Sequence, residues 1–255
     1  MNNKHKIYIL VSFCFALTIL PSCSNNKEKL DYTLQDGIEF YKQEEYSKAF
    51  DIILKFAKQG VPEAQSLIGF MYKHGMTKKA LPNFEEANKW YLKAAVQGDV
   101  QAQYHMGVSF ERGVGIKQDY TRAVKWYIEA GEQGNVKAQY NLGVLYSSGK
   151  YVNQNLDSAF FWYQNAGELN HLMAQNNLGI MYMNGLGTEV NVSNAVKWFK
   201  KAASQNNSNA QYNLGTLFFN GVGVPENKKT AKNWFQKSAD QGNEEAIKAL
   251  EENFE

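Results

Sequence analysis

Tryptophan recurs along this chain at a constant interval, and that recurrence constrains the fold more than any other feature of the sequence. The interval is 36 residues, and the tryptophans are Trp90, Trp126, Trp162, Trp198 and Trp234. Glycine keeps the same period at Gly107, Gly143, Gly179 and Gly215. Self-similarity at a period of about 20–50 residues is typical of proteins built from stacked repeats. We therefore expect a repeat protein rather than a single globular core.

Each repeat is predicted to contain two helices. In the segment 138–146, Ala138, Leu142 and Leu145 share one helical face, and a glycine-containing break follows. The second helix should begin after a column of N-cap residues, whose side chains accept hydrogen bonds from first-turn N–H groups. This column consists of Asn83, Asp119, Asn155, Asn191 and Asn227.

Two further polar columns predict where the second helix ends and the next repeat begins. One contains only glycine and asparagine, which tolerate the left-handed conformation that often ends a helix. Its members are Gly98, Gly134, Asn170, Asn206 and Gly242. The residues that follow should cap the next first helix, and they are Asp99, Asn135, His171, Asn207 and Asn243.

The tryptophans are predicted to be core residues. In one second helix, Ala123, Trp126, Tyr127 and Ala130 share a face, so large rings lie between alanines. A glycine inside a helix costs about 1 kcal/mol relative to alanine. We therefore expect the glycine column of the first helices to permit close backbone contact with a neighbouring helix.

These columns resemble the Sel-like repeat family, a relative of the tetratricopeptide repeats. One copy of the pattern reads Ala102…Gly107…Phe110…Gly113-Val114-Gly115…Ala123…Trp126-Tyr127…Ala130…Gly134. The third copy departs from it, with Gly149-Lys150 in place of the Gly-x-Gly turn. The resemblance implies an all-α fold, a right-handed α/α solenoid, or superhelix, of 36-residue helix-turn-helix repeats. The five repeats within 62–242 are predicted at 62–98, 99–134, 135–170, 171–206 and 207–242.

The two ends of the repeat array are predicted to be atypical. Residues 31–61 resemble a divergent N-terminal helical hairpin without the tryptophan, and 243–255 should form a C-terminal capping helix. Solenoids need such ends because their outer repeats have no neighbour to cover them.

The first residues predict export and lipidation. Residues 1–22 combine a basic start with an apolar run from Ile7 to Leu20, as in a cleaved signal peptide. The segment Leu20-Pro21-Ser22-Cys23 resembles a bacterial lipobox, which implies lipidation of Cys23 and a lipidated tether at 23–30. The alternative is an ordinary secretory signal with a bystander cysteine. Ser24 is not the aspartate associated with inner-membrane retention, so we expect the outer membrane of a Gram-negative bacterium, facing the periplasm.

The composition and the positions of the histidines favour a non-enzymatic role. Lys4 and Lys6 would be removed with the signal peptide, so the number of basic residues falls from 27 to 25 and equals the 25 acidic residues. This balance of charge gives no reason to expect a nucleic-acid partner. His74, His105 and His171 have no His or Cys partner at metal-ligand spacing. His105 stands in a column otherwise filled by leucine and asparagine, and is interpreted as structural. We expect no catalytic residue, no metal and no cofactor.

The first helices predict a partner-binding surface. Counted from the alanine of each repeat, positions three, seven and ten lie opposite the core stripe but carry many apolar groups. The predicted concave groove for a protein or extended peptide contains Phe70, Tyr104, Glu111, Tyr140, Asn176, Met183, Tyr212 and Phe219. The alternative for positions three and seven is packing between neighbouring first helices. The lysines of the second helices are interpreted as a solvated outer face, with anionic lipid or cell-wall polymer as the alternative.

Taken together, these features predict a non-enzymatic interaction scaffold in the bacterial cell envelope, contacting the membrane only through its lipid anchor. The family resemblance implies an adaptor role without identifying the partner. Two alternatives stay open at this point. One is an envelope enzyme acting on peptidoglycan or β-lactams, and the other is an accessory protein of polysaccharide export.

Overall fold

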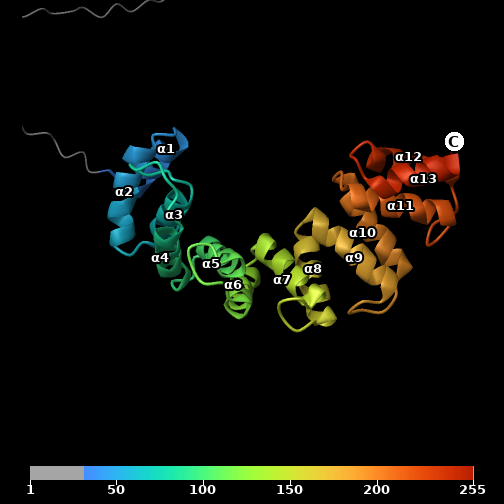
Figure 1. Cartoon of the computed structure of the whole chain (residues 1–255), viewed down its shortest axis with the longest axis horizontal. Coiled ribbons are helices and arrows are strands. Elements are labelled where there is room, and N and C mark those ends of the chain that lie inside the picture. Colours follow the sequence, from blue (N-terminus) through green and yellow to red (C-terminus); the bar gives the residue numbers. More distant parts are fainter. Residues whose placement is uncertain (1–31, 255) are drawn as a thin grey trace, which may run out of the picture. The chain divides into compact units, whose positions relative to one another are not determined.

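The computed structural model describes residues 32–254, which form thirteen α-helices and no β-strand. Each helix packs against the helices before and after it in sequence (Figure 1). The helices are α1 (Leu34–Lys42), α2 (Tyr46–Lys58), α3 (Pro62–Lys73), α4 (Phe84–Ala95), α5 (Val100–Arg112), α6 (Tyr120–Glu132), α7 (Val136–Ser148), α8 (Leu156–Glu168), α9 (Leu172–Asn184), α10 (Val192–Ser204), α11 (Ser208–Asn220), α12 (Lys228–Ala239) and α13 (Glu244–Phe254). The predicted all-α solenoid of helical hairpins is confirmed. The predicted signal peptide, Cys23 and the tether lie outside the described residues.

The helices alternate between two roles. The odd-numbered helices α3 to α11 are the first helices of the hairpins, and the even-numbered helices α4 to α12 are the second helices. First helices also contact one another in succession, α3 with α5, α5 with α7 and α7 with α9. The helices α3, α5, α7 and α9 therefore share one continuous face.

The predicted caps are confirmed. Asn83 accepts a hydrogen bond from the backbone N–H of Glu86 at 3.0 Å, and the other four second helices begin in the same way. On the first helices, Asp99 accepts from Ala102, and His171 uses its Nδ1 atom to accept from Ala174. The five residues predicted to end the second helices all have positive φ. Side-chain hydrogen bonds and left-handed residues thus mark both ends of each second helix.

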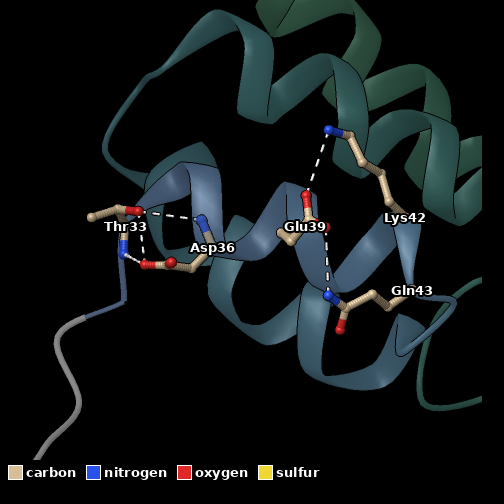
Figure 2. A network of polar contacts seen from close by, with 5 residues as sticks. All are labelled: Thr33, Asp36, Glu39, Lys42 and Gln43. Carbon is tan, nitrogen blue, oxygen red and sulfur yellow. Dashed lines mark hydrogen bonds and ion pairs between the residues drawn. The ribbon is translucent and has the colours of Figure 1, made fainter. Parts of the chain in front are cut away.

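Helix α1 begins with a reciprocal capping pair, shown in Figure 2. The Asp36 N–H donates to Thr33 Oγ1 at 3.2 Å, and the Thr33 N–H donates to the Asp36 carboxylate at 2.7 Å. These hydrogen bonds hold the pKa of Asp36 below its usual value. In the last turn, Lys42 lies 3.6 Å from the Glu39 carboxylate. The α1 helix is therefore fixed at its start and carries a lysine at its end.

The glycine column meets an aromatic ring rather than a neighbouring backbone. A Cβ atom added at Gly107, Gly143, Gly179 or Gly215 would lie closer than 3.0 Å to a ring of the second helix of the same hairpin. That ring belongs to the residue after the tryptophan, and it is buried in every copy. The rings are Tyr127, Tyr163, Phe199 and Phe235, with Tyr91 against Gly69 in the first repeat. This contact joins the two helices of each hairpin.

The tryptophans lie between neighbouring second helices. A Cβ at Gly131 in α6 would lie 3.0 Å from the Trp162 ring, and one at Gly167 in α8 would lie 3.3 Å from the Trp198 ring. Trp162 is buried, whereas the other four tryptophans are half-buried. The column is thus at the edge of the core, and the adjacent tyrosine or phenylalanine is at its centre.

A ladder of glutamines connects each hairpin to the next. One buried glutamine at the start of each first helix donates from Nε2 to a carbonyl eight residues earlier; these are Gln65, Gln103, Gln139, Gln175 and Gln211. In four cases, a second glutamine 30 or 32 residues later donates to its Oε1 at 2.7–2.8 Å. In the remaining copy, Leu169 occupies the donor position. Within residues 32–254, the buried Oε1 of Gln139 therefore has no hydrogen-bond partner.

The glycine–ring contact predicts that Gly143→Ala destabilises the protein, although alanine is the better helix former. The added methyl group would overlap the buried Tyr163 ring. Overpacking of this kind costs about 1–3 kcal/mol. Urea unfolding followed by circular dichroism measures the effect. Val144→Ala, at the neighbouring exposed position, is the control and should change the free energy of unfolding by less than about 1 kcal/mol. Equal stability of Gly143→Ala and the wild type would contradict this packing account.

The interrupted glutamine ladder predicts that Leu169→Gln stabilises the protein. Leu169 is 51% exposed, so its replacement loses little buried area, and the new amide can donate to Gln139 Oε1. Satisfying a buried polar atom contributes about 1 kcal/mol. Conversely, Gln133→Leu should destabilise by a similar amount, because it leaves Gln103 Oε1 without its donor. Urea unfolding of both variants checks the pair; a Leu169→Gln protein no more stable than the wild type would refute the ladder.

Candidate functional site: a cleft across the first helices

A cleft of about 550 Å³ crosses the first helices at the N-terminal end of the array. Helices α1, α3, α5 and α7 each contribute to its walls. The residues that define its chemistry are Tyr41, Lys42, Glu63, Phe70, Asp99, Tyr104, His105 and Lys137. The cleft thus combines aromatic and charged side chains from α1 and from the first helices α3, α5 and α7, and we call it the first-helix cleft.

Aromatic rings build the apolar part of the first-helix cleft. The rings of Tyr41 and Phe70 meet edge to face at 6.4 Å, and Phe70 also contacts the His74 ring at 4.2 Å. Tyr104 is half-buried and lies 6.1 Å from the buried Tyr127 ring. The cleft aromatics are therefore supported from behind by the core while one side stays accessible.

His105 is a structural residue that also lines the cleft. Its ring stacks on Tyr91 at 4.7 Å, in a column where later repeats have Asn141, Asn177 and Asn213. Burial, helped by the nearby charges of Lys73, His74 and Lys137, lowers the pKa of His105 to about 4. Its buried Nδ1 has no hydrogen-bond partner among the described residues. At neutral pH the imidazole is therefore uncharged.

Charged side chains of both signs surround the first-helix cleft. Burial lowers the pKa of Lys73, and the charges of Arg112 and Lys137 lower it further. Burial and Lys137 together lower the pKa of His171 as well. The wall of the cleft itself carries Lys42 and Lys137 together with the carboxylates of Glu63 and Asp99, so both signs of charge line it.

The structure gathers some of the predicted groove residues into the first-helix cleft and uses others for packing. Phe70 and Tyr104 line the cleft. Glu111 accepts a hydrogen bond from Tyr127, and Asn176 is buried and accepts one from Asn213 at 3.1 Å. These last two side chains are held by contacts inside the fold.

The other predicted groove residues also contact their own fold. Tyr140 stacks on His171 at 4.4 Å, and Tyr212 lies 5.7 Å from Phe235. Met183 packs against the α10–α11 core cluster. Phe219 meets Phe235 and the Phe254 ring of α13. The C-terminal capping helix thus explains why position ten is apolar at Phe219. A partner-binding role for Tyr140, Tyr212, Met183 and Phe219 stays a prediction.

Sequence reasoning missed much of the cleft wall. Tyr41 and Lys42 come from the divergent hairpin, whose residues could not be numbered by the positions of the 36-residue repeat. Lys137 belongs to a repeat but lies outside positions three, seven and ten. A usable signal was the charge of the first helices: α7 carries Lys137, whereas α9 and α11 carry no charged residue.

Among residues 32–254, no three His, Cys, Asp or Glu side chains are grouped so that they could hold a metal ion. No helix in the same range is long and apolar enough to cross a membrane.

The low pKa of His105 predicts an acid-dependent loss of stability. A histidine in the unfolded chain takes up its proton near pH 6.5, whereas folded His105 does so near pH 4. Because the unfolded state binds the proton first, the free energy of unfolding should fall as the pH decreases from about 6.5 to about 4. His105→Asn, which copies the later repeats, should reduce this loss by about 2–3 kcal/mol. Urea unfolding across this pH range provides the measurement, and parallel pH profiles for the two proteins would contradict it.

Comparisons with known proteins agree with this architecture. The Sel1 repeat family matches residues 62–99, 100–135, 136–171, 172–207 and 208–243. The chain is similar to a Sel1 repeat protein from Oxalobacter formigenes, with a TM-score of 0.74, 35% identity, and coverage of 85% of this chain and 86% of that one. It is also similar to a protective antigen of uropathogenic Escherichia coli that displays an SLR fold. That match has a TM-score of 0.81 and 31% identity, and covers 87% of this chain and 49% of that one.

Curated relatives match over shorter segments. The DAP3-binding cell death enhancer 1 of Rattus norvegicus is 33% identical over 79 residues, which is 31% of this chain and 15% of that protein. The chitin synthase regulator SKT5 of Saccharomyces cerevisiae is 39% identical over 66 residues, which is 26% of this chain and 9% of that protein. Sel1 repeat proteins generally mediate protein–protein interactions. Because the five matched repeats cover most of its length, this chain belongs to the Sel1 repeat family.

Proposed function

We propose that this protein is a non-enzymatic scaffold of the bacterial cell envelope that binds a segment of a partner protein in the first-helix cleft. The observation that carries the proposal is the cleft itself, where Phe70 and Tyr104 line an accessible cavity of about 550 Å³. Aromatic side chains dominate many protein–protein contacts. Elsewhere along the first helices, Asn176 and Phe219 are engaged by the fold.

The names of the relatives support a binding role. The rat relative is named for binding DAP3 and the yeast relative for regulating chitin synthase. The matched segments span less than a fifth of those two proteins, so they support interaction in general and no particular partner.

The state of His105 favours binding over acid–base catalysis. An efficient general base has a pKa near the working pH. The pKa of His105 is about 4, and its ring is stacked on Tyr91. This histidine is therefore suited to forming a wall of the cleft and unsuited to proton transfer near neutral pH.

The proposal includes a lipid anchor at Cys23, from the lipobox-like segment Leu20-Pro21-Ser22-Cys23. Acyl chains at this position would hold the repeats beside a membrane while they remain in water. We place the protein in the outer membrane, facing the periplasm.

Site-specific photo-crosslinking in the native cells tests partner binding. A photoreactive residue replaces Ser66 or Gln101, two polar positions lining the cleft, and a matched probe replaces the exposed Lys200 on α10. Both cleft probes should yield the same protein adduct, and the Lys200 probe should not. No adduct at the cleft, or the same adduct from all three positions, would refute the proposed binding site.

Metabolic labelling tests the anchor independently. Cells fed a clickable fatty acid should incorporate it into the wild-type chain, because Cys23 is the proposed attachment point. Cys23→Ala should abolish the label and release the protein from the membrane fraction. An unlabelled wild type would contradict lipidation and leave the cleft proposal to its own test.

A further inference from the structure

Two tyrosine rings are stacked where the third repeat departs from the repeat pattern. Tyr151 lies in the loop between α7 and α8, in the turn that follows Gly149, and Tyr120 is the first residue of α6. Their ring centroids are 4.1 Å apart and their planes differ by 5°. We call Tyr120 and Tyr151 the tyrosine stack.

The tyrosine stack takes the place of a backbone contact that other repeats make through glycine. In the repeats with a Gly-x-Gly turn, the position of Tyr151 is filled by Gly115, Gly187 and Gly223. A Cβ atom added at Gly115 would lie closer than 3.0 Å to Phe84, the first residue of α4. In the third repeat the Tyr151 ring contacts Tyr120, the first residue of α6, instead. Two phenol side chains thus meet where a glycine meets a helix elsewhere.

The tyrosine stack is accessible from solvent. Tyr151 is 46% exposed, and Tyr120 is half-buried. The other tyrosine–tyrosine contacts within residues 32–254 have ring centroids 5.8–6.1 Å apart and planes inclined by at least 36°. Two of these other contacts also involve a buried ring, that of Tyr127 or Tyr163. In the described part of the chain, the tyrosine stack therefore combines an accessible position with rings that already lie face to face.

Neighbouring polar side chains act on both phenols. A hydrogen bond from Lys150 lowers the pKa of the Tyr151 hydroxyl, and the Lys150 Nζ atom lies 4.9 Å from the centroid of the Tyr151 ring. Gln118 Nε2 donates a hydrogen bond to the Tyr120 hydroxyl at 3.0 Å. A phenolate gives up an electron more readily than a phenol, so Lys150 favours oxidation of Tyr151.

We propose that Tyr120 and Tyr151 form an oxidative cross-linking site, where hydrogen peroxide and a haem peroxidase join the two rings as dityrosine and so fasten the second repeat to the third. This inference goes beyond the proposed function and does not depend on partner binding. It requires only that an oxidant reaches two rings that the fold already holds in contact.

The coupling reaction is balanced as follows. Each phenol loses one electron and one proton, which gives two phenoxyl radicals. The unpaired electrons, shared with the ring carbons beside the hydroxyl groups, pair to form one carbon–carbon bond between the rings. The hydrogens on these two carbons then move to the phenolic oxygens, which restores both aromatic rings. The two electrons and two protons reduce one hydrogen peroxide to two waters.

The cross-link would close a loop that contains all of α6 and α7. A covalent cross-link stabilises a folded protein mainly by restricting the unfolded chain, and longer loops gain more. The bond would therefore make unfolding of the second and third repeats more difficult.

Peroxidase treatment of the full chain tests the inference. The protein, in mild detergent and at high dilution, receives hydrogen peroxide and a haem peroxidase. The monomer should gain the blue fluorescence of dityrosine, and peptide mapping should find a product in which Tyr120 is joined to Tyr151. The cross-linked monomer should unfold at a higher urea concentration than the untreated protein.

Matched variants assign the product to the tyrosine stack. Tyr151→Phe keeps the stacked ring but has no hydroxyl to oxidise, so it should lose the cross-linked peptide and gain no resistance to urea. The treated variant also accounts for oxidation elsewhere in the chain. Tyr46→Phe removes one ring of the inclined Tyr41–Tyr46 pair and should keep the product at the same yield. Circular dichroism before treatment establishes that both variants fold as the wild type does.

Several results would overturn the inference. Absence of the Tyr120–Tyr151 peptide from the treated wild type would do so, as would dityrosine found only in covalent dimers. An equal yield of dityrosine fluorescence from Tyr151→Phe would assign the reaction to other tyrosines. A cross-linked monomer that unfolds at the same urea concentration as treated Tyr151→Phe would show that the bond does not fasten the two repeats.

Discussion

Every repeat in this protein depends on an aromatic ring seated on a glycine. The ring comes from the second helix, immediately after the tryptophan, and the glycine lies in the first helix of the same hairpin. A glycine there weakens the isolated helix by about 1 kcal/mol, but it allows the two helices to approach until the ring is buried. Tyr127 against Gly107 is one of five such contacts. The tryptophans and glutamines then join neighbouring hairpins, so each type of contact has its own place in the repeat.

This division of roles leaves the outer part of the first helices free to vary. Because the core contacts recur every 36 residues, residues such as Lys73 and Lys137 can change without altering the hairpins. The helices α3, α5 and α7 carry charged residues at such positions, whereas α9 and α11 contain no charged residue. A regular framework can therefore hold a binding surface at one end only.

Much of the fold could be predicted from the sequence, because its main signals are local. The caps, the left-handed residues and the helical hairpins follow from single columns, such as Asn83 with its counterparts. Periodicity also identified the glycines as contact points but not their partner, since Trp126 and Tyr127 share a helical face and only packing distinguishes them. Most of the cleft was not predictable, because Tyr41 lies outside the repeat register. The helical register of α11 predicted that Phe219 lies on the surface. Its contact with Phe254 was missed, because that contact depends on how α13 packs and not on the repeat pattern.

The central claim is that binding takes place in the first-helix cleft, where aromatic side chains of α1, α3 and α5 meet. Hydrogen exchange of the full chain, measured with and without the partner protein captured by crosslinking at Ser66 and Gln101, tests this claim most directly. The account predicts slower exchange in α1, α3, α5 and α7, with α9 and α11 unchanged. Protection confined to α9 and α11, or spread evenly over all first helices, would contradict it.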